Sequence, residues 1–182
     1  MNGKTVRTTS PVEGLRAGIA LVPEDRKHQG LHLSMSVRNN ISLASLKALT
    51  KGGWISLAKE ADRSAQRIAD LRIKTPNADQ IAGTLSGGNQ QKVVIAKWLE
   101  TKPQILIMDE PTRGIDVGAK HEIYVLMKDL AAQGYSIIMI SSDMPELLGV
   151  SDRILVMRRG RISGELSKAE ASQERVLDLA AH

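Results

Sequence analysis

Two short segments constrain the fold of this chain more than any other feature. Residues 85–92 read LSGGNQQK and open onto a helix-like run at 90–100, while residues 105–112 read ILIMDEPT, an apolar strand that ends in Asp109 and Glu110. A glycine turn at a helix start offers unpaired backbone N–H groups to an anion. Adjacent carboxylates at a strand end suit Mg²⁺ and the activation of water. Together the two segments predict half of a nucleotide-hydrolysing site.

The chain lacks the loop that would complete such a site. No stretch of its sequence matches G-x-x-x-x-G-K-[ST], whose backbone N–H groups and lysine hold the β- and γ-phosphates of a nucleotide. Without that loop most of the phosphate binding is lost. The sequence therefore predicts that this chain alone neither binds ATP tightly nor hydrolyses it. It also suggests a truncated reading frame that begins after the missing loop.

Several segments, in this order along the chain, resemble the motifs of ATP-binding cassettes. LSGGNQQK and the strand with two terminal acids resemble the ABC signature and the Walker B motif. PEDRKHQG at residues 23–30, DEPTRGIDVGAK at 109–120 and SSDMPELL at 141–148 narrow the resemblance. They resemble the second, C-terminal cassette of the double-cassette ATPases that power bacterial ribose, galactose, xylose and arabinose importers. The resemblance extends from about Gly14 to the C-terminus.

The resemblance implies an α/β fold: a partial P-loop NTPase cassette with a mostly parallel sheet, an inserted helical subdomain and no P-loop strand. Apolar runs of strand length occur at residues 18–22, 105–108, 136–140 and 153–157. Because these runs are continuously apolar, we expect strands that are covered on both faces, as in parallel sheets. The expected division is a helical, signature-side subdomain at about 36–84, a signature-to-switch region at 85–160 and a C-terminal tail at 161–182.

Local signals place helices between these strands. Residues 36–71 are polar and helix-like with a break at Gly52-Gly53, and Ser56 can cap the helix that follows the break. Apolar residues recur at i, i+3, i+4 and i+7 on one face of a later helix: Ile123, Leu126, Met127 and Leu130.

Two more helix starts are expected towards the C-terminus. Asp143 can cap a helix whose first turn accommodates Pro145. Ser167 and Glu170 have the spacing of a capping box, which predicts a helix start there, and Leu177 and Leu179 lie in the helix that follows.

The signature residues are the first candidate ligands of ATP. By the resemblance, Ser86, Gly87, Gly88 and Gln90 contact a nucleotide that is held by the P-loop of an opposing cassette, so they act in trans. Glycines allow the backbone to approach a phosphate closely, and the serine hydroxyl adds a donor. The alternative is an ordinary glycine-rich helix start, which the neighbouring N-Q-Q-K and Walker B segments disfavour.

The carboxylates have separate expected roles. Asp109 is the expected Mg²⁺ ligand, through water, and Glu110 is the expected base that positions water for attack on the γ-phosphate. Side chains of adjacent strand residues diverge, so one can face the metal and the other the nucleophile. Asp116 matches the aspartate of the D-loop, which couples the two ATP sites in the family. It can also serve as the N-cap of the following helix.

Two positions depart from most cassettes. Ser142 stands where a switch histidine normally contacts the γ-phosphate, and a hydroxyl cannot carry an imidazolium charge. Glu24 stands where most cassettes have the Q-loop glutamine. The second cassette of sugar importers shares both departures, so they support the resemblance and imply a weakened ATP site.

Bulk composition bears on partners and location. The chain has no cysteine, which fits a reducing cytoplasm, and no apolar run near the length of a membrane span. Its net charge of +5 is spread along the chain without interleaved aromatics, so we expect no nucleic acid partner. The resemblance implies a peripheral place at the inner face of the cell membrane. The implied partners are membrane permease subunits, an opposing cassette on the same polypeptide and, indirectly, a periplasmic sugar-binding protein.

Two other functions remain open at this stage. A soluble ABC ATPase that acts on nucleic acid or ribosomes would share LSGG and DEPT, although PEDRK and SSDMPE favour the importer. A non-catalytic interaction fragment is the third reading, because the P-loop motif is missing. The sequence does not identify the sugar.

Overall fold

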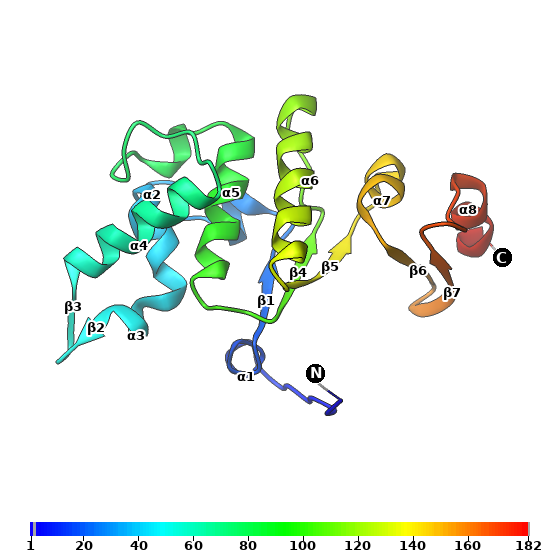
Figure 1. Ribbon diagram of the computed structural model, residues 1–182, viewed down its shortest axis with the longest axis horizontal. Helices are drawn as coiled ribbons and strands as arrows, with labels where there is room; N and C mark the ends of the chain where they lie inside the picture. The colour runs from blue at the N-terminus through cyan, green and yellow to red at the C-terminus, as the bar shows by residue number, and fades with distance from the viewer. Residues whose placement is uncertain (2, 182) are drawn as a thin grey trace. The chain divides into compact units, whose positions relative to one another are not determined.

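The computed structural model describes residues 1 and 3–181, which divide into two compact units, Met1–Ile140 and Ser141–His182 (Figure 1). In chain order the first unit contains α1 (Pro11–Arg16), β1 (Ile19–Val22), the π-helical turn η1 (Arg26–Gly30), α2 (Val37–Ser42), the 3₁₀ turn η2 (Leu43–Ser45), α3 (Leu46–Leu49), β2 (Thr50–Lys51), β3 (Trp54–Ile55), α4 (Leu57–Asp70), the 3₁₀ turn η3 (Ala82–Thr84), α5 (Gly87–Leu99), β4 (Ile105–Asp109), α6 (Val117–Ala132) and β5 (Ser136–Ile140). The second unit contains α7 (Met144–Val150), β6 (Arg153–Arg158), β7 (Arg161–Ser167) and α8 (Gln173–Ala181).

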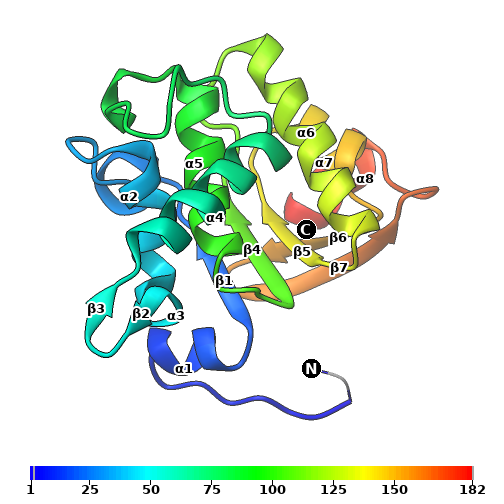
Figure 2. The same cartoon turned by 60° about the vertical axis from the view of Figure 1, so that its left-hand side comes forward.

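A parallel sheet in the order β1-β4-β5 forms the base of the first unit. Its register pairs Ala20 with Leu106, and Leu106 in turn with Ile137. Helices α5 and α6 lie over one face of this sheet, where α5 contacts β1 and α6 contacts β5 (Figure 2). The strand side chains buried most completely are Ala20, Val22, Leu106 and Met108. The expected α/β architecture with a parallel sheet is confirmed, but the run at 153–157 does not belong to that sheet as expected, because β6 pairs antiparallel with β7.

The other face of the sheet is apolar but accessible. Leu21, Ile138 and Ile140 are 47%, 51% and 50% exposed. The expectation that the strands are covered on both faces is therefore wrong for the part of the chain that the structure describes. Strand β4 alternates between buried and half-buried residues and β5 between half-buried and exposed residues, although their sequences do not alternate between apolar and polar. Continuous apolarity gives each strand two faces that favour burial, and only one of them is covered here.

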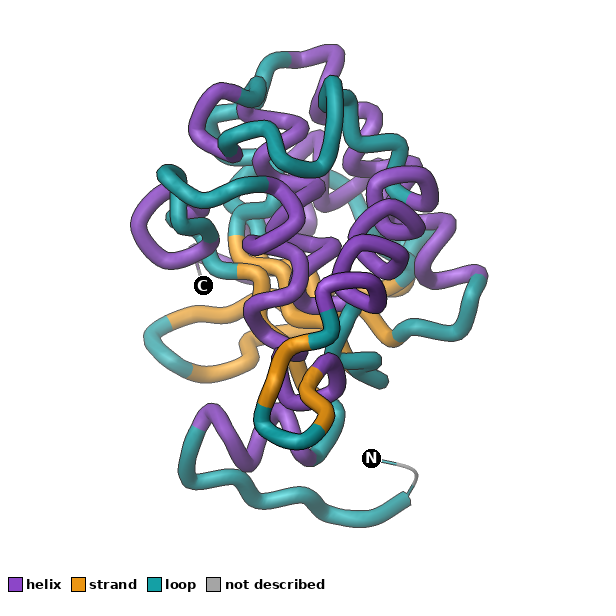
Figure 3. Tube along the Cα trace, turned by 90° about the vertical axis from the view of Figure 1, so that its left-hand side faces the viewer, coloured by secondary structure: helices purple, strands orange, loops and turns teal. Residues whose placement is uncertain are grey.

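The helical region between β1 and α5 packs through α2 and α4 against α5. The predicted break at Gly52-Gly53 is the turn of the small β2–β3 hairpin, which Figure 3 shows as two short strands between helices. Both glycines have positive φ, 59° and 87°, as a tight hairpin turn requires. Ser56 occupies the N-cap position of α4 as predicted, but its side chain makes no capping hydrogen bond.

Charged side chains connect the helices. Glu100, at the end of α5, accepts a hydrogen bond from Arg67 Nε at 2.7 Å and lies 3.6 Å from Arg63 Nη1, which joins α4 to α5. Glu122 on α6 forms ion pairs with Lys74 and Lys92, each at 2.8 Å. The hydrogen bonds from Lys74 and Lys92 lower the pKa of Glu122 to about 2. The carboxylate is therefore ionised at neutral pH and holds α6 against α5.

The apolar face predicted for α6 is confirmed. The four residues at helical spacing are all buried: Ile123, Leu126, Met127 and Leu130. Helix α6 ends at Ala132, and Gly134 follows it with a φ of 95°. Glycine adopts this conformation without the penalty that a β-carbon would bring.

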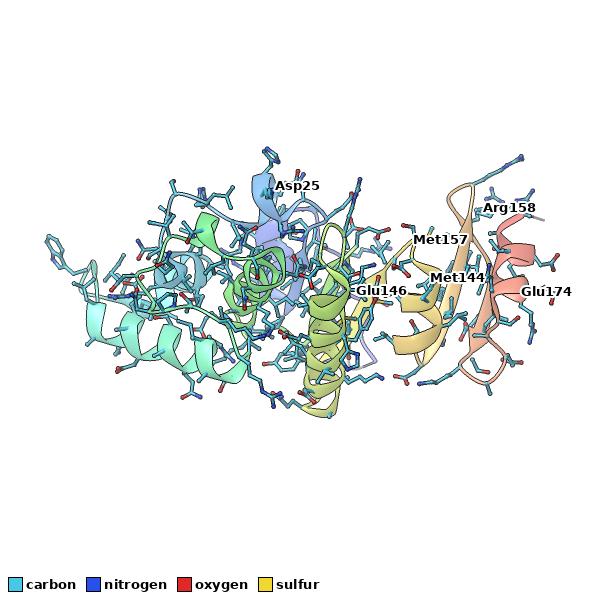
Figure 4. The ribbon with its side chains drawn as sticks, turned by 90° about the horizontal axis from the view of Figure 1, so that it is seen from above. Asp25, Met144, Glu146, Met157, Arg158 and Glu174 are labelled. Carbon is cyan, nitrogen blue, oxygen red and sulfur yellow. The ribbon has the colours of Figure 1, made fainter. Side chains whose placement is uncertain are left out.

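The second unit is an antiparallel β6–β7 pair with two helices. Its buried cluster is Ile154, Val156, Leu166 and Val176, and Met144 of α7 packs against this cluster (Figure 4). Asp143 caps α7 as predicted, because its carboxylate accepts a hydrogen bond from Glu146 N–H at 3.2 Å. Pro145 lies in the first turn of that helix.

The last helix contains Leu177 and Leu179 as predicted, but its predicted start at Ser167 is wrong. Ser167 and Glu170 do bond to each other, with the hydroxyl of Ser167 donating to the Glu170 carboxylate at 2.5 Å. However, Ser167 is still part of β7, where it pairs with Arg153, so the bond closes a turn after the strand. Helix α8 begins at Gln173, and the Ser172 hydroxyl accepts from Arg175 N–H at 3.2 Å. Among the described residues, no helix is both long and apolar enough to cross a membrane.

Candidate functional site

The candidate site lies at the carboxyl edge of the parallel sheet. Strands β1 and β4 are neighbours, so Glu24, which follows β1, and the Asp109-Glu110 pair, which ends β4, belong to the same edge. Ligands of open α/β sheets bind outside the carboxyl ends of the strands. The arrangement therefore places the predicted carboxylates where such a fold offers its binding crevice.

The backbone holds Glu110 in an unusual conformation. Its φ is 43°, in the left-handed region that non-glycine residues seldom occupy. The Glu110 N–H donates to Ile140 O at 2.8 Å, and its carbonyl accepts from Arg113 N–H at 3.0 Å. Backbone strain of this kind persists where the surrounding structure over-determines it, and it clusters at functional sites. Asp109 still pairs with Ile140 in the sheet, so the backbone turns sharply between the two acids.

The signature turn begins α5. Ser86 is exposed at the N-cap position, and its hydroxyl accepts a hydrogen bond from Asn89 Nδ2 at 2.9 Å without capping a backbone N–H. Inside α5, Gln90 N–H bonds to Ser86 O at 2.9 Å. The first N–H groups of a helix have no partner within it, and they carry the positive end of the helix dipole. An anion at this turn would meet those N–H groups, and its binding there stays a prediction.

Packing explains the two glycines of the signature independently of any ligand. A β-carbon at Gly88 would lie 2.6 Å from Ala119 Cβ on α6. A β-carbon at Gly87 would lie 2.8 Å from Arg26 Nη2 and 3.3 Å from Gly114 O. The glycines thus allow the start of α5 to approach α6 and the loop that follows Glu110.

Gln90 is oriented towards the protein interior. The residue is 5% exposed, and its Nε2 donates to Leu85 O at 3.1 Å, with Ala82 O and Gly83 O both at 3.4 Å. These contacts give Gln90 the role of holding the loop before the signature. Its direct contact with a nucleotide stays a prediction.

The loop after the carboxylates links several candidate residues. Asp116 is the N-cap of α6, where its carboxylate accepts from Ala119 N–H at 2.9 Å, so the capping role is confirmed. Glu24 is exposed, and its carboxylate forms an ion pair with the Arg113 guanidinium. The guanidinium of Arg26 donates to Arg113 O at 2.6 Å and to Gly114 O at 2.9 Å. Sequence reasoning did not single out Arg26, since its acceptors are backbone carbonyls 87 and 88 positions away.

Ser142 belongs to the second unit, two residues beyond the end of β5. Its neighbour Ser141 accepts from Asp143 N–H at 3.0 Å and donates to Glu146 at 2.5 Å, which fixes the turn into α7. The remaining candidates lie in the first unit: Glu24, Ser86, Gly87, Gly88, Gln90, Asp109, Glu110 and Asp116. The role of Ser142 stays a prediction.

Comparison with known proteins agrees with this geometry. Residues 1–113 match the protein family described as ABC transporter. A ribose import ATP-binding protein of Clostridium tetani is 55% identical over 181 residues, which are 99% of this chain and 36% of that protein. A xylose import ATP-binding protein of Photobacterium profundum is 52% identical over 180 residues, again 99% of this chain and 36% of that protein. The chain spans about a third of the length of these relatives.

Solved structures show the same fold. An ATP-binding cassette of an ABC transporter in its ADP conformation has a TM-score of 0.73 at 26% identity, over 97% of this chain and 73% of that one. A nucleotide-free ATP-binding cassette from an ABC transporter has a TM-score of 0.73 at 25% identity, over 93% of this chain and 70% of that one. The signature turn, the acidic strand end and these matches lead to one conclusion: the chain belongs to the ABC transporter family and has the fold of its ATP-binding cassettes.

Proposed function

We propose that this chain is part of the ATP-hydrolysing subunit of an importer of monosaccharides. The observation that carries the proposal is the Asp109-Glu110 pair at the carboxyl edge of the sheet, in a chain about half identical to ribose and xylose import ATP-binding proteins. The loop after this pair approaches the start of the signature helix at Gly87. ATP hydrolysis by the full-length subunit would drive transport through membrane permease subunits at the inner face of the membrane. A periplasmic sugar-binding protein would deliver the sugar.

Within this function, the chain would serve two nucleotides. Ser86, Gly87 and Gly88 would close on ATP held by an opposing cassette of the same polypeptide, whereas Glu110 would orient water at the ATP of its own cassette. Asp116 would connect the two sites, and Glu24 would lie in the loop that signals to the permease. In the 182-residue chain alone we expect neither tight ATP binding nor turnover, because its sequence has no P-loop motif.

The carboxylate oxygens of Asp109 and Glu110, at the end of β4, are ligands of the kind that Mg²⁺ prefers. Among the described residues, no group of three or more His, Asp or Glu side chains forms a ready-made metal cluster. Mg²⁺ in nucleotide sites needs no such cluster, since it keeps several waters and binds one or two carboxylates together with the phosphates. The Asp109 carboxylate would contact the ion through a water molecule. The bound ion would neutralise the charge that develops on the phosphates.

Replacing Glu110 by glutamine tests the proposal in the full-length ATPase. We expect Glu110→Gln to lower kcat, because the amide is a poor base for the attacking water; a positioned base contributes about 10²–10⁴-fold. The matching change in the other cassette should cost more, because the site of this chain has Ser142 in place of a switch histidine. The measurement is steady-state ATP hydrolysis of both variants at saturating ATP, after thermal melting has shown that both are folded. Equal losses would refute the asymmetry, and a wild-type protein without ATPase activity would refute the function.

A further inference from the structure

Arg26 lies at the junction of three segments that the candidate site uses. It is the first residue of the π-helical turn η1, which follows Asp25 (labelled in Figure 4). Its guanidinium donates two hydrogen bonds to the loop after Glu110, at 2.6 Å to Arg113 O and at 2.9 Å to Gly114 O. Arg26 therefore connects η1 to residues 113 and 114, far away in the sequence, through hydrogen bonds whose donor is charged.

The same guanidinium limits the residue that the signature turn can contain. A β-carbon at Gly87 would lie 2.8 Å from Arg26 Nη2 and 3.5 Å from Arg26 Cζ. The end of an arginine side chain is flexible, so alanine at this position would displace the guanidinium rather than clash with a rigid wall. Displacement would break the bonds to Arg113 O and Gly114 O. The same position of the guanidinium thus excludes a side chain at Gly87 and makes the hydrogen bonds to the two carbonyls.

The turn that carries Arg26 is itself fixed against the signature helix. Lys97 Nζ donates to Gly30 O at the end of η1. A β-carbon at Gly30 would lie 2.9 Å from Val94 Cγ2 on α5. Arg26 Nε is buried and has no hydrogen-bond partner among the described residues, so only the two terminal nitrogens anchor the side chain. The turn that carries Arg26 is therefore fixed against α5, and two carbonyl acceptors hold the guanidinium itself.

From these contacts we propose that Arg26 is a positioning residue that holds the signature turn and the loop after Glu110 in one fixed arrangement. This inference rests on the proposed function, in which those two segments serve different nucleotides. Arg26 touches no reacting atom; it fixes where Gly87 lies relative to Gly114. A planar guanidinium can donate to two carbonyls at once, whereas an ammonium is a point charge without that fork.

The test uses the full-length ATPase with Arg26→Ala, Arg26→Lys, Gly87→Ala and the double variant Arg26→Ala/Gly87→Ala. We expect Arg26→Ala to lower kcat by about tenfold to a hundredfold, since small misplacements of catalytic groups have effects of this size. ATP affinity should change much less than kcat, because the P-loop of the opposing cassette would supply most of the phosphate binding. Lysine should restore part of kcat. Gly87→Ala should reproduce the loss, and the double variant should be no worse than either single change.

Two controls separate a positioning role from a structural one. Lys27→Ala, at the exposed neighbour, should leave kcat unchanged. Hydrogen exchange should be faster at the hydrogen-bonded N–H groups of Gln90, Arg113 and Ile115 together in Arg26→Ala and unaltered in Lys27→Ala. A wild-type kcat in folded Arg26→Ala, or losses that multiply in the double variant, would overturn the inference. If Arg26→Ala does not fold, the kcat and hydrogen exchange of Arg26→Lys and Gly87→Ala test the inference by the same criteria.

Failure of this inference can be distinguished from failure of the proposed function. If the wild-type protein hydrolyses no ATP, the proposed function is wrong. Hydrogen exchange alone then tests whether Arg26 positions the two segments. Unchanged exchange in both segments would then overturn the positioning role. If the wild type is active and the Arg26 variants match it, the function stands and only this inference falls.

Discussion

Ser86→Arg is expected to abolish ATP hydrolysis by the full-length ATPase while leaving the fold of this chain intact. Ser86 is exposed at the start of α5, where a nucleotide from the opposing cassette would meet the signature. An arginine side chain there would occupy the space of the incoming γ-phosphate and hold the cassettes apart. Loss of one preorganised donor at a charged transition state costs about 10²–10³-fold, and blocked closure should cost at least as much.

The expected stability change from Ser86→Arg is small. The Ser86 hydroxyl makes no capping bond to a backbone N–H, and exposed substitutions usually stay within about 0.5 kcal/mol. Ser56→Arg is the matched control, because Ser56 is also an N-cap serine without a side-chain cap bond. Thermal melting of the chain and ATPase assays of the full-length protein check both variants. If Ser86→Arg melts the chain but leaves the ATPase rate unchanged, Ser86 is a structural residue and its action in trans is refuted.

Gly88→Ala is expected to destabilise the chain through a contact between two helices. The new β-carbon would lie 2.6 Å from Ala119 Cβ, and neither atom can rotate away because both are fixed to helix backbones. The two helices must separate, and overpacking of this kind costs about 1–3 kcal/mol. That cost exceeds the roughly 0.5–1 kcal/mol that alanine gains over glycine within a helix. Urea unfolding of the purified chain measures the difference.

A second substitution should reverse the effect of Gly88→Ala. Ala119→Gly removes the opposing β-carbon, so Gly88→Ala/Ala119→Gly should be more stable than Gly88→Ala alone. Gly149→Ala is the control, because its added β-carbon meets no atom within 4 Å. An additive double variant, less stable than either single change, would show that the Gly88–Ala119 contact does not limit the packing of α5 on α6.

Features encoded over a few residues were predictable from the sequence. Three such features are formed by residues that lie two to seven positions apart: the Asp143 cap, the apolar face of α6 and the turn at Gly52-Gly53. The capping-box spacing of Ser167 and Glu170 was misleading because β7 continues to Ser167, and strand pairing depends on a partner elsewhere in the chain. Local patterns therefore predict the elements better than their boundaries.

Long-range contacts explain what the sequence did not reveal. The motif predicted glycines at 87 and 88 for the approach of a phosphate, yet their nearest neighbours in the fold are Arg26 and Ala119. No sequence pattern relates Arg26 to carbonyl groups of residues 113 and 114, because any residue has a carbonyl. Likewise, a continuously apolar strand does not say which element covers each face. The motifs predicted candidate residues, whose chemical roles stay predictions, whereas the contacts that position these residues required the structure.

In the proposed function, the signature of this chain closes on a nucleotide held by another cassette. The most direct measurement is maleimide modification of Ser86→Cys, followed by mass spectrometry; the chain has no cysteine of its own, so the label is unique within it. In the full-length ATPase, Mg-ATP should slow modification strongly, while the isolated chain should react at the same rate with and without Mg-ATP. Equal rates in the full-length protein, or protection of the isolated chain, would contradict the claim.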